Sequence, residues 1–415
     1  MSPQTHQLPH QSRPFVIDPE GSDILGEVAA LREQGDVVRV ELPGAVPAWS
    51  VTGFETGRRL LADPRVSKDP RRHWPAWTSG AVPADWPLAA WVTIRSMFTA
   101  YGAEHTRLRK LVSGSFTKHR TEALRPAVAR ITGELIDRLG ALPTGQPLDL
   151  RREFAGPLPA AVIGELFRVP ESLRPELSLL FHRLFDTSAD GAEAGMLVER
   201  VHALVGKLIT DKRARPGDDL TSRLIKSQET RGGFSDLEIR DTLVHLLSAG
   251  YETTVNLIDQ AVHALLTHPE QLELARSGRA SWSDVVEESL RWQAPAAHLM
   301  LRFAVEDIAL GETTIRRGDA ILVSVAAAGR DPKVHGRDAD RFDITRPTRH
   351  THLTFGHGVH FCMGAPLARM EATIALPALF ERFPGLRLAV PPRELLPLPS
   401  FISNGHRRLP VLTGA

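Results

Sequence analysis

The residue of this chain best suited to metal chemistry is its only cysteine, Cys362. Glycines flank it in the segment Phe355-Gly356-His357-Gly358-Val359-His360-Phe361-Cys362-Met363-Gly364, and glycine lets a backbone turn tightly and approach a flat partner closely. Pro366 predicts the first turn of a helix, so the sulfur precedes a helix N-terminus. Unpaired N–H groups and the helix dipole favour a negatively charged sulfur there. The segment therefore presents a single thiolate to a metal.

This segment resembles the haem-binding loop of the cytochrome P450 monooxygenases. The resemblance implies that Cys362 is the axial thiolate ligand of haem b iron, whose electron donation favours O–O bond cleavage. It also implies that Phe355 packs beside the sulfur. A buried structural cysteine is the alternative, and the complete loop makes it the less favoured one. The positions that carry the resemblance are Phe355, Gly356, Gly358, His360, Cys362 and Gly364.

A zinc site is a second alternative, because four histidines crowd the same segment. Closed zinc sites usually use several thiolates or closely spaced ligand pairs, and this chain has one cysteine. Iron or zinc content of the purified protein separates the two interpretations. The histidines concerned are His350, His352, His357 and His360.

The composition is that of a globular protein with little net charge. Lys plus Arg number 50 and Asp plus Glu 49, which gives no argument for nucleic acid or an anionic surface. The lone cysteine excludes an intramolecular disulfide, and the N-terminus lacks a signal-peptide layout. No run reaches the about 18 apolar residues that span a bilayer. We expect a cytoplasmic monomer without a membrane anchor, similar to soluble actinobacterial class I members of the family.

The order of periodic segments predicts a mainly α fold with small peripheral β-sheets, which is the cytochrome P450 fold by resemblance. Helical periodicity dominates residues 104–300, and β-type runs occur at 37–42, 49–52, 314–315 and 320–323. We expect residues 1–13 to be a flexible tail and residues 14–415 to form a single haem domain.

The longest predicted helix begins with a capping box at Ser235 and Glu238 and ends before Pro269. Its centre, Ala249-Gly250-Tyr251-Glu252-Thr253-Thr254, combines a glycine, an acid and hydroxyls in an apolar helix, which indicates a functional site. A kink with an exposed glutamate is the alternative. The stretch resembles the family's oxygen-binding helix, which implies that Glu252 and Thr253 stabilise bound dioxygen and relay protons.

Two further groups of charged residues follow from the resemblance. Glu288 and Arg291, three apart on one helix face, resemble the family's E-x-x-R element, and Arg341 resembles the arginine that completes a structural Glu-Arg-Arg cluster. Arginines and histidines suit the haem propionates. The positions that match propionate contacts are His105, Arg109, Arg302 and His360.

The substrate site is predicted from family positions and from an aromatic segment. Residues 69–100 contain four tryptophans and Phe98, which either form a lid or anchor the segment to the core. An apolar pocket implies a lipophilic substrate such as a steroid, terpenoid or macrolide. The pocket residues expected are Leu247, Ser248, Ala249, Ala296, Ala297, Leu299, Phe401 and Ile402.

The resemblance implies a monooxygenase that hydroxylates or epoxidises its substrate with O2. Electrons would come from NAD(P)H through a ferredoxin and a ferredoxin reductase, and the haem would do the chemistry. A peroxide-driven peroxygenase is one alternative, which the Glu252–Thr253 pair disfavours. A non-catalytic haem-binding sensor is another, and it predicts a spectrum that responds to ligands without product.

Overall fold

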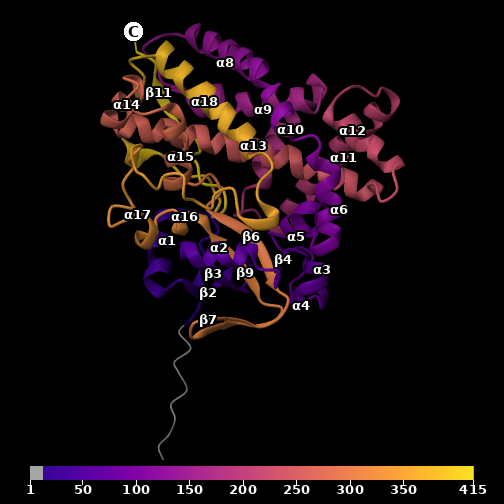
Figure 1. The fold of residues 1–415 in the computed structure, drawn as a ribbon. Coiled ribbons are helices and arrows are strands. Elements are labelled where there is room, and N and C mark those ends of the chain that lie inside the picture. Colours follow the sequence, from indigo (N-terminus) through magenta and orange to yellow (C-terminus); the bar gives the residue numbers. More distant parts are fainter. Residues whose placement is uncertain (1–12, 415) are drawn as a thin grey trace, which may run out of the picture.

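The computed structural model describes residues 13–414, which form a large helical part above a smaller part rich in strands (Figure 1). Helices account for 53% of the structure, which confirms the mainly α prediction. Residues 1–12 of the predicted tail lie outside the described residues.

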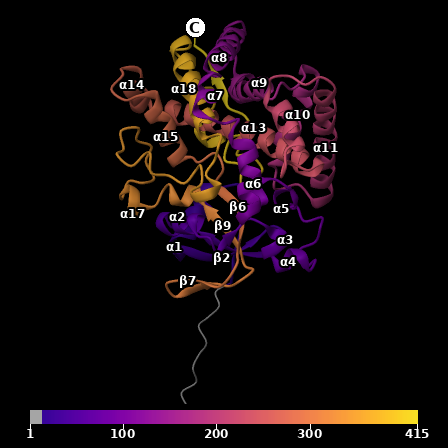
Figure 2. The ribbon, with the colours of Figure 1, turned by 45° about the vertical axis from the view of Figure 1, so that its right-hand side comes forward.

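The predicted long helix is α13, Asp236–Thr267, and it runs through the middle of the helical part (Figure 1). Ser235 accepts a hydrogen bond from the Glu238 N–H and Glu238 reciprocates, so the capping box is present as predicted. Helix α18 packs on α13 and also lies beside α8 in both views (Figure 2). Helices that pack on α13 are α9 (Pro157–Leu166), α10 (Arg174–Leu184), α11 (Gly191–Ala214), α15 (Trp282–Trp292) and α18 (Ala365–Arg382), and α8 (Arg125–Gly140) packs on α9 and α18.

A six-stranded sheet with the order β1-β2-β3-β9-β6-β4 forms the lower part of the molecule in Figure 1. The four predicted β-type runs are all confirmed as strands. Strand β6 is antiparallel to β9, with an irregularity between Leu299 and Arg302. The strands of this sheet are β1 (Phe15–Val16), β2 (Val37–Leu42), β3 (Val46–Val51), β4 (Val66–Ser67), β6 (His298–Ala304) and β9 (Ala320–Ser324).

Small elements complete the fold around these two parts. The short strands are β5 (Leu148–Asp149), β7 (Ile308–Leu310), β8 (Thr313–Ile315), β10 (Arg387–Leu388) and β11 (Pro410–Leu412). The remaining α-helices are α1 (Ile24–Gln34), α2 (Phe54–Ala62), α3 (Pro70–His73), α4 (Pro75–Thr78), α5 (Ala90–Thr93), α6 (Gly102–Ser113), α7 (Lys118–Glu122), α12 (Leu220–Lys226), α14 (Pro269–Arg276), α16 (Val325–Ala328) and α17 (Pro332–His335).

The aromatic segment 69–100 divides into an anchored half and a half that faces cavities. Trp74 and Trp86 are buried in the core under the sheet, and the Trp86 indole N–H donates to the Pro43 carbonyl at 2.7 Å. Trp91 and Phe98 line internal cavities instead. The anchoring interpretation therefore holds for the first half of the segment.

Candidate active site

Two of the three glycines that mark the Cys362 loop adopt a backbone conformation that favours glycine, and the third does not. Gly356 and Gly358 have φ values of 75° and 70°, which glycine adopts without strain. A Cβ on Gly358 would lie 2.7 Å from the Leu61 carbonyl oxygen. Gly364 has a φ of −79°, which other residues also adopt, and it is the N-cap of α18. The Cys362 N–H donates to the Phe355 carbonyl at 2.8 Å and closes the loop.

The Cys362 sulfur lines the largest internal cavity described here, of about 290 Å³. The Cys362 side chain is exposed to the space of the cavity, but the protein packed around the cavity displaces water near the sulfur and raises the pKa of this thiol, and the N–H groups of Gly364 and Ala365 partly offset that effect. Arg109 and Arg369 act in the same direction as these N–H groups. A metal cation bound to this sulfur would stabilise the thiolate, so that the proton is released to solvent despite the raised pKa.

The cavity collects most of the residues that the sequence assigned to a cofactor and a substrate. Helix α13, strand β6 and the Cys362 loop form its walls. Among the predicted residues, those that line it are Arg109, Ala249, Thr253, Ala296, Leu299, Arg302, Phe355, Gly356, His360, Cys362, Gly364 and Ile402.

Several buried basic groups at this cavity lack an acidic partner among the described residues. Arg302 is buried, its Nη1 has no hydrogen-bond partner, and burial lowers its pKa to about 10. Lys68 is also buried, and its Nζ reaches only the Met300 carbonyl at 3.4 Å and the face of the Phe98 ring. Burial, and then the charge of Arg302, lowers the Lys68 pKa well below its usual value. An anion at this place would remove the cost of these uncompensated charges.

Two histidines stand beside these cations. The rings of His105 and His360 lie 4.1 Å apart between centroids. Burial and then Arg109 lower the His105 pKa to about 4, and burial and then Lys68 lower the pKa of His360. Arg109 Nη2 donates to the Phe361 carbonyl at 2.7 Å, and His105 Nε2 has no partner. Both histidines are therefore neutral near pH 7 and available as donors.

One face of α13 lines the cavity, and two α13 residues predicted for the substrate pocket, Leu247 and Ser248, do not lie on that face. The lining positions follow the helical repeat, so Leu247, one residue off, packs into the core instead. Ser248 lines a neighbouring cavity, which is separate from the one at Cys362. Gly250 packs closely against α9, and a Cβ there would lie 2.8 Å from Ile163 Cδ1, so the end of that side chain would have to move. The α13 positions in the cavity wall are Leu246, Ala249, Gly250, Thr253, Thr254 and Leu257.

Two other residues predicted for the substrate pocket, Ala297 and Phe401, do not line the cavity either. Ala297 is fully buried, and its N–H donates to the Ile402 carbonyl at 2.7 Å. Phe401 packs in the core under the sheet. Each has a neighbour in the chain, Ala296 or Ile402, that does line the cavity.

The structure separates the predicted acid–alcohol pair. Thr253 lines the cavity, and its hydroxyl donates to the Ala249 carbonyl at 2.6 Å. Glu252 is 1% exposed, so the kink alternative, which expected an exposed glutamate, is wrong. The Glu252 side chain also does not line the cavity at Cys362, so the structure does not place its carboxylate at the cavity wall. Arg151 donates to Glu252 at 2.6 Å, and His182 Nδ1 lies 3.1 Å from its other oxygen. The His182 side chain is 43% exposed, so Glu252 connects to the surface.

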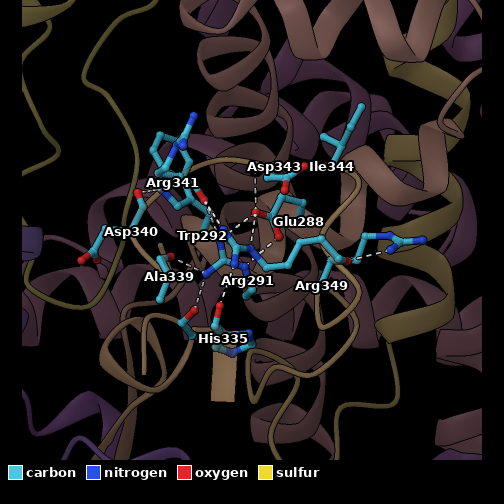
Figure 3. A network of polar contacts seen from close by, with 12 residues as sticks. Glu288, Arg291, Trp292, His335, Ala339, Asp340, Arg341, Asp343, Ile344 and Arg349 are labelled. Atoms are coloured by element: carbon cyan, nitrogen blue, oxygen red, sulfur yellow. Dashed lines mark hydrogen bonds and ion pairs between the residues drawn. The ribbon is translucent and has the colours of Figure 1, made fainter. Parts of the chain in front are cut away.

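The predicted Glu-Arg pair forms a closed buried cluster (Figure 3). Arg291 places all five N–H donors, two on Glu288 and one on each of the carbonyls of Gly329, Ala339 and Arg341. The third side chain of the cluster is Arg346, whose Nε lies 3.5 Å from Glu288. Arg341 contributes only its carbonyl, and its side chain is exposed, so the assignment of Arg341 is corrected.

Comparison with known proteins identifies the family. The family model described as Cytochrome P450 matches residues 159–276 and 282–396. The 2-hydroxy-5-methyl-1-naphthoate 7-hydroxylase of Streptomyces carzinostaticus is 44% identical over 96% of this chain and 97% of its own length. The mycinamicin IV hydroxylase/epoxidase of Micromonospora griseorubida is 36% identical over 95% of this chain and 97% of its own. The chain belongs to the cytochrome P450 family.

A solved structure supports the same conclusion for the cytochrome P450 fold. CYP154A1 from Streptomyces coelicolor A3(2) superposes with a TM-score of 0.92 at 53% identity, over 96% of this chain and all of that one. The protein is thus an enzyme of the P450 monooxygenase class, and the family implies a haem iron cofactor. No helix within residues 13–414 is long and apolar enough to cross a membrane.

The residues present fit a haem. A thiol in the wall of an enclosed cavity supplies an iron ligand, and the unpaired basic groups Lys68 and Arg302 suit two carboxylates. By contrast, residues 13–414 hold no group of three or more His, Cys, Asp or Glu arranged for a metal ion, which removes support for the zinc alternative.

Sequence reasoning missed two ionisable residues of the cavity. Lys68 lies in a short segment after β4 without any local signal, and tertiary contact alone brings it to Arg302. Glu371 on α18 lines the cavity, its Oε2 has no partner, and burial raises its pKa to about 8. It lies nine residues after Cys362, and nothing in the neighbouring sequence distinguishes it from an exposed helical glutamate.

Proposed function

We propose that the protein hydroxylates or epoxidises a lipophilic small molecule such as a steroid, terpenoid or macrolide. The relatives named above are a naphthoate hydroxylase and a mycinamicin hydroxylase/epoxidase, which supports a secondary-metabolite substrate. The observation that carries the proposal is the meeting of the Cys362 sulfur, unpaired basic residues and apolar walls in one cavity. We further propose that residues 14–415 act as one haem domain and that the chain is a monomer.

The proposed cofactor is haem b, held without covalent attachment, because the single cysteine cannot supply the C-x-x-C-H pattern of attached haem. When bound, the haem iron supplies O2 activation and oxygen-atom transfer. In this proposal Cys362 is the iron ligand, while Phe355, Gly356 and Gly364 shape the loop. The propionate contacts would be His105, Arg109, Arg302, His360 and Lys68.

The proposed proton path uses both Glu252 and Thr253. Protons would enter at the half-exposed His182 and pass to the Glu252 carboxylate, which His182 contacts at 3.1 Å. The Thr253 hydroxyl donates to the Ala249 carbonyl and lines the cavity, so it would hold a proton at the cavity wall, with water carrying protons between the Glu252 carboxylate and this hydroxyl. A ferredoxin and an NAD(P)H-dependent ferredoxin reductase are the proposed electron donors.

The experiment that tests this function compares the reduced carbon monoxide spectra of the parent and Cys362→Ala. We expect the parent to show the thiolate-type band and the variant to lose it, with iron content reported for both. An unchanged band in the variant would refute the proposed iron ligand.

Turnover then separates the monooxygenase from its alternatives. We expect product from a reconstituted ferredoxin chain, and we expect Thr253→Ala to divert electrons to peroxide. Product from peroxide alone would favour the peroxygenase, and ligand-induced spectra without any product would favour the sensor. Thr210→Ala is a matched control, because the Thr210 hydroxyl also donates to a carbonyl one turn back, that of Gly206, but lines neither this cavity nor its neighbour.

A further inference from the structure

A second cavity of about 240 Å³ adjoins the one at Cys362, and we call it the outer cavity. It lies between α5, the end of α10, α11 and the first half of α13. Its walls are mainly apolar. Five residues line both cavities, so only side chains separate the two spaces: Trp91, Phe98, Phe185, His245 and Ala249.

The separating wall is built from aromatic contacts between different elements. The ring of Trp91 meets that of Phe185 edge to face with centroids 5.0 Å apart, and Phe98 lies 4.9 Å from His245. Trp91 comes from α5, whereas Phe185 follows α10. A ligand that occupies both cavities must therefore pass between these shared side chains.

The two cavities lie end to end along α13. The outer cavity uses Leu237 to Ala249 and the inner one Leu246 to Leu257. Twelve residues separate Asp241 from Thr253, which corresponds to about 18 Å along the helix. A single elongated molecule can therefore place one end beside Thr253 and the other near Asp241.

The charges of the outer cavity favour an anion. Arg95 is exposed, and its guanidinium forms no ion pair or hydrogen bond with any residue in the range 13–414. Asp241 is the only acidic residue in the lining. One of its carboxylate oxygens accepts a hydrogen bond from the backbone N–H of Arg95 at 2.8 Å, and the other accepts one from Arg240 Nε at 2.9 Å. A cationic ligand would have to break these bonds, whereas an anion finds a free guanidinium.

The two histidines of the lining do not change this balance. Burial and then Arg240 lower the pKa of His202, and burial and then Lys68 lower that of His245 to about 3. Both are neutral near pH 7, so two arginines face one aspartate.

We propose that the outer cavity binds the anionic end of an elongated apolar substrate, with Arg95 as its ion-pair partner, while the opposite end lies in the cavity at Cys362. This inference rests on the proposed monooxygenase function and names its substrate class: an apolar molecule with a carboxylate or similar anion remote from the oxidised carbon.

The test uses the ferric holoenzyme and straight-chain ligands. Dodecanoic, tetradecanoic and hexadecanoic acids are compared with their methyl esters and with the amine of equal length. Binding is followed by the spin-state shift and by calorimetry, so that a ligand that binds without a spectral change is still detected. We expect the acids to bind about three- to tenfold more tightly than the esters, the amines to bind worst, and the preference to shrink in high salt.

The variant Arg95→Gln should remove the preference for acid over ester. Arg72→Gln is the matched control, since Arg72 is an exposed arginine that lines neither cavity, and it should retain the preference. Equal affinity of acid and ester in the parent, or an unchanged preference in Arg95→Gln, would overturn the proposal.

Product analysis and the carbon monoxide spectrum complete the test. The hydroxyl group should appear in the half of the chain remote from the carboxylate, and oxidation next to the carboxylate would overturn the proposed orientation. A normal thiolate-type band together with equal affinities would refute only this inference. Loss of that band in the parent would refute the proposed function itself.

Discussion

Two buried groups of charged residues in this cytochrome P450 differ in how their hydrogen bonds are satisfied. In the Glu288–Arg291–Arg346 cluster, every N–H of Arg291 has an acceptor within the protein. At the Cys362 cavity, Arg302 and Lys68 are also buried, but within residues 13–414 neither forms an ion pair with an acidic side chain. A closed cluster supports the fold, whereas unpaired buried charges indicate a place for a ligand.

The largest effect is expected from opening the closed cluster. Arg291→Ala leaves the Glu288 carboxylate buried without its main partner, so we expect a loss of about 3–5 kcal/mol in the free energy of unfolding. Chemical denaturation measures it. Arg341→Ala is the control, because the exposed side chain is dispensable and its carbonyl remains, and it should cost less than about 0.5 kcal/mol. Similar losses in both variants would contradict the corrected assignment.

The opposite outcome is expected at the cavity. Arg302→Gln removes a buried charge that lacks a partner, so the haem-free chain should be no less stable than the parent. The holoenzyme should release haem to apomyoglobin at least about tenfold faster, because a propionate loses its partner. Lys68→Met should likewise leave the haem-free chain no less stable than the parent and make the holoenzyme release haem faster.

Arg317→Gln is the control for these two variants, since Arg317 is exposed and lines no part of the cavity. If Arg302→Gln destabilised the haem-free chain as much as Arg291→Ala does, the distinction between closed and unpaired groups would fail.

A pH-dependent difference is expected from Glu371. Burial raises its pKa from 4.5 to about 8, so the folded state holds this proton while the unfolded state loses it. The stability that the neutral carboxyl provides is complete below pH 4.5 and declines as the pH rises towards 8. Glu371→Gln should therefore gain stability relative to the parent by at most roughly 1.4 kcal/mol per pH unit within that window.

Urea denaturation at several pH values measures this gain. Glu381→Gln, on the exposed side of the same helix, should show no such trend. A constant difference between Glu371→Gln and the parent across the window would contradict a neutral Glu371.

The sequence by itself determined the features that depend on neighbours in the chain. The capping box at Ser235 was predicted from local geometry alone, whereas the roles of the Cys362 loop and of the Glu288–Arg291 pair were predicted from short motifs that resemble those of the family. The contact from the Thr253 hydroxyl to the Ala249 carbonyl, one helical turn away, also depends only on neighbours in the chain.

Only the tertiary structure decided which side chains meet across the chain. It selected Arg346 over Arg341, turned Glu252 towards Arg151 rather than the cavity, and brought Lys68 beside Arg302. Whether a helix side chain faces the cavity depends on how that helix is rotated against its neighbours. Which of two nearby arginines reaches a buried acid depends on the path of the loop that carries them. Burial then shifts the pKa values of Arg302 and Lys68 downwards, because packing has removed water from these groups without supplying an acidic partner.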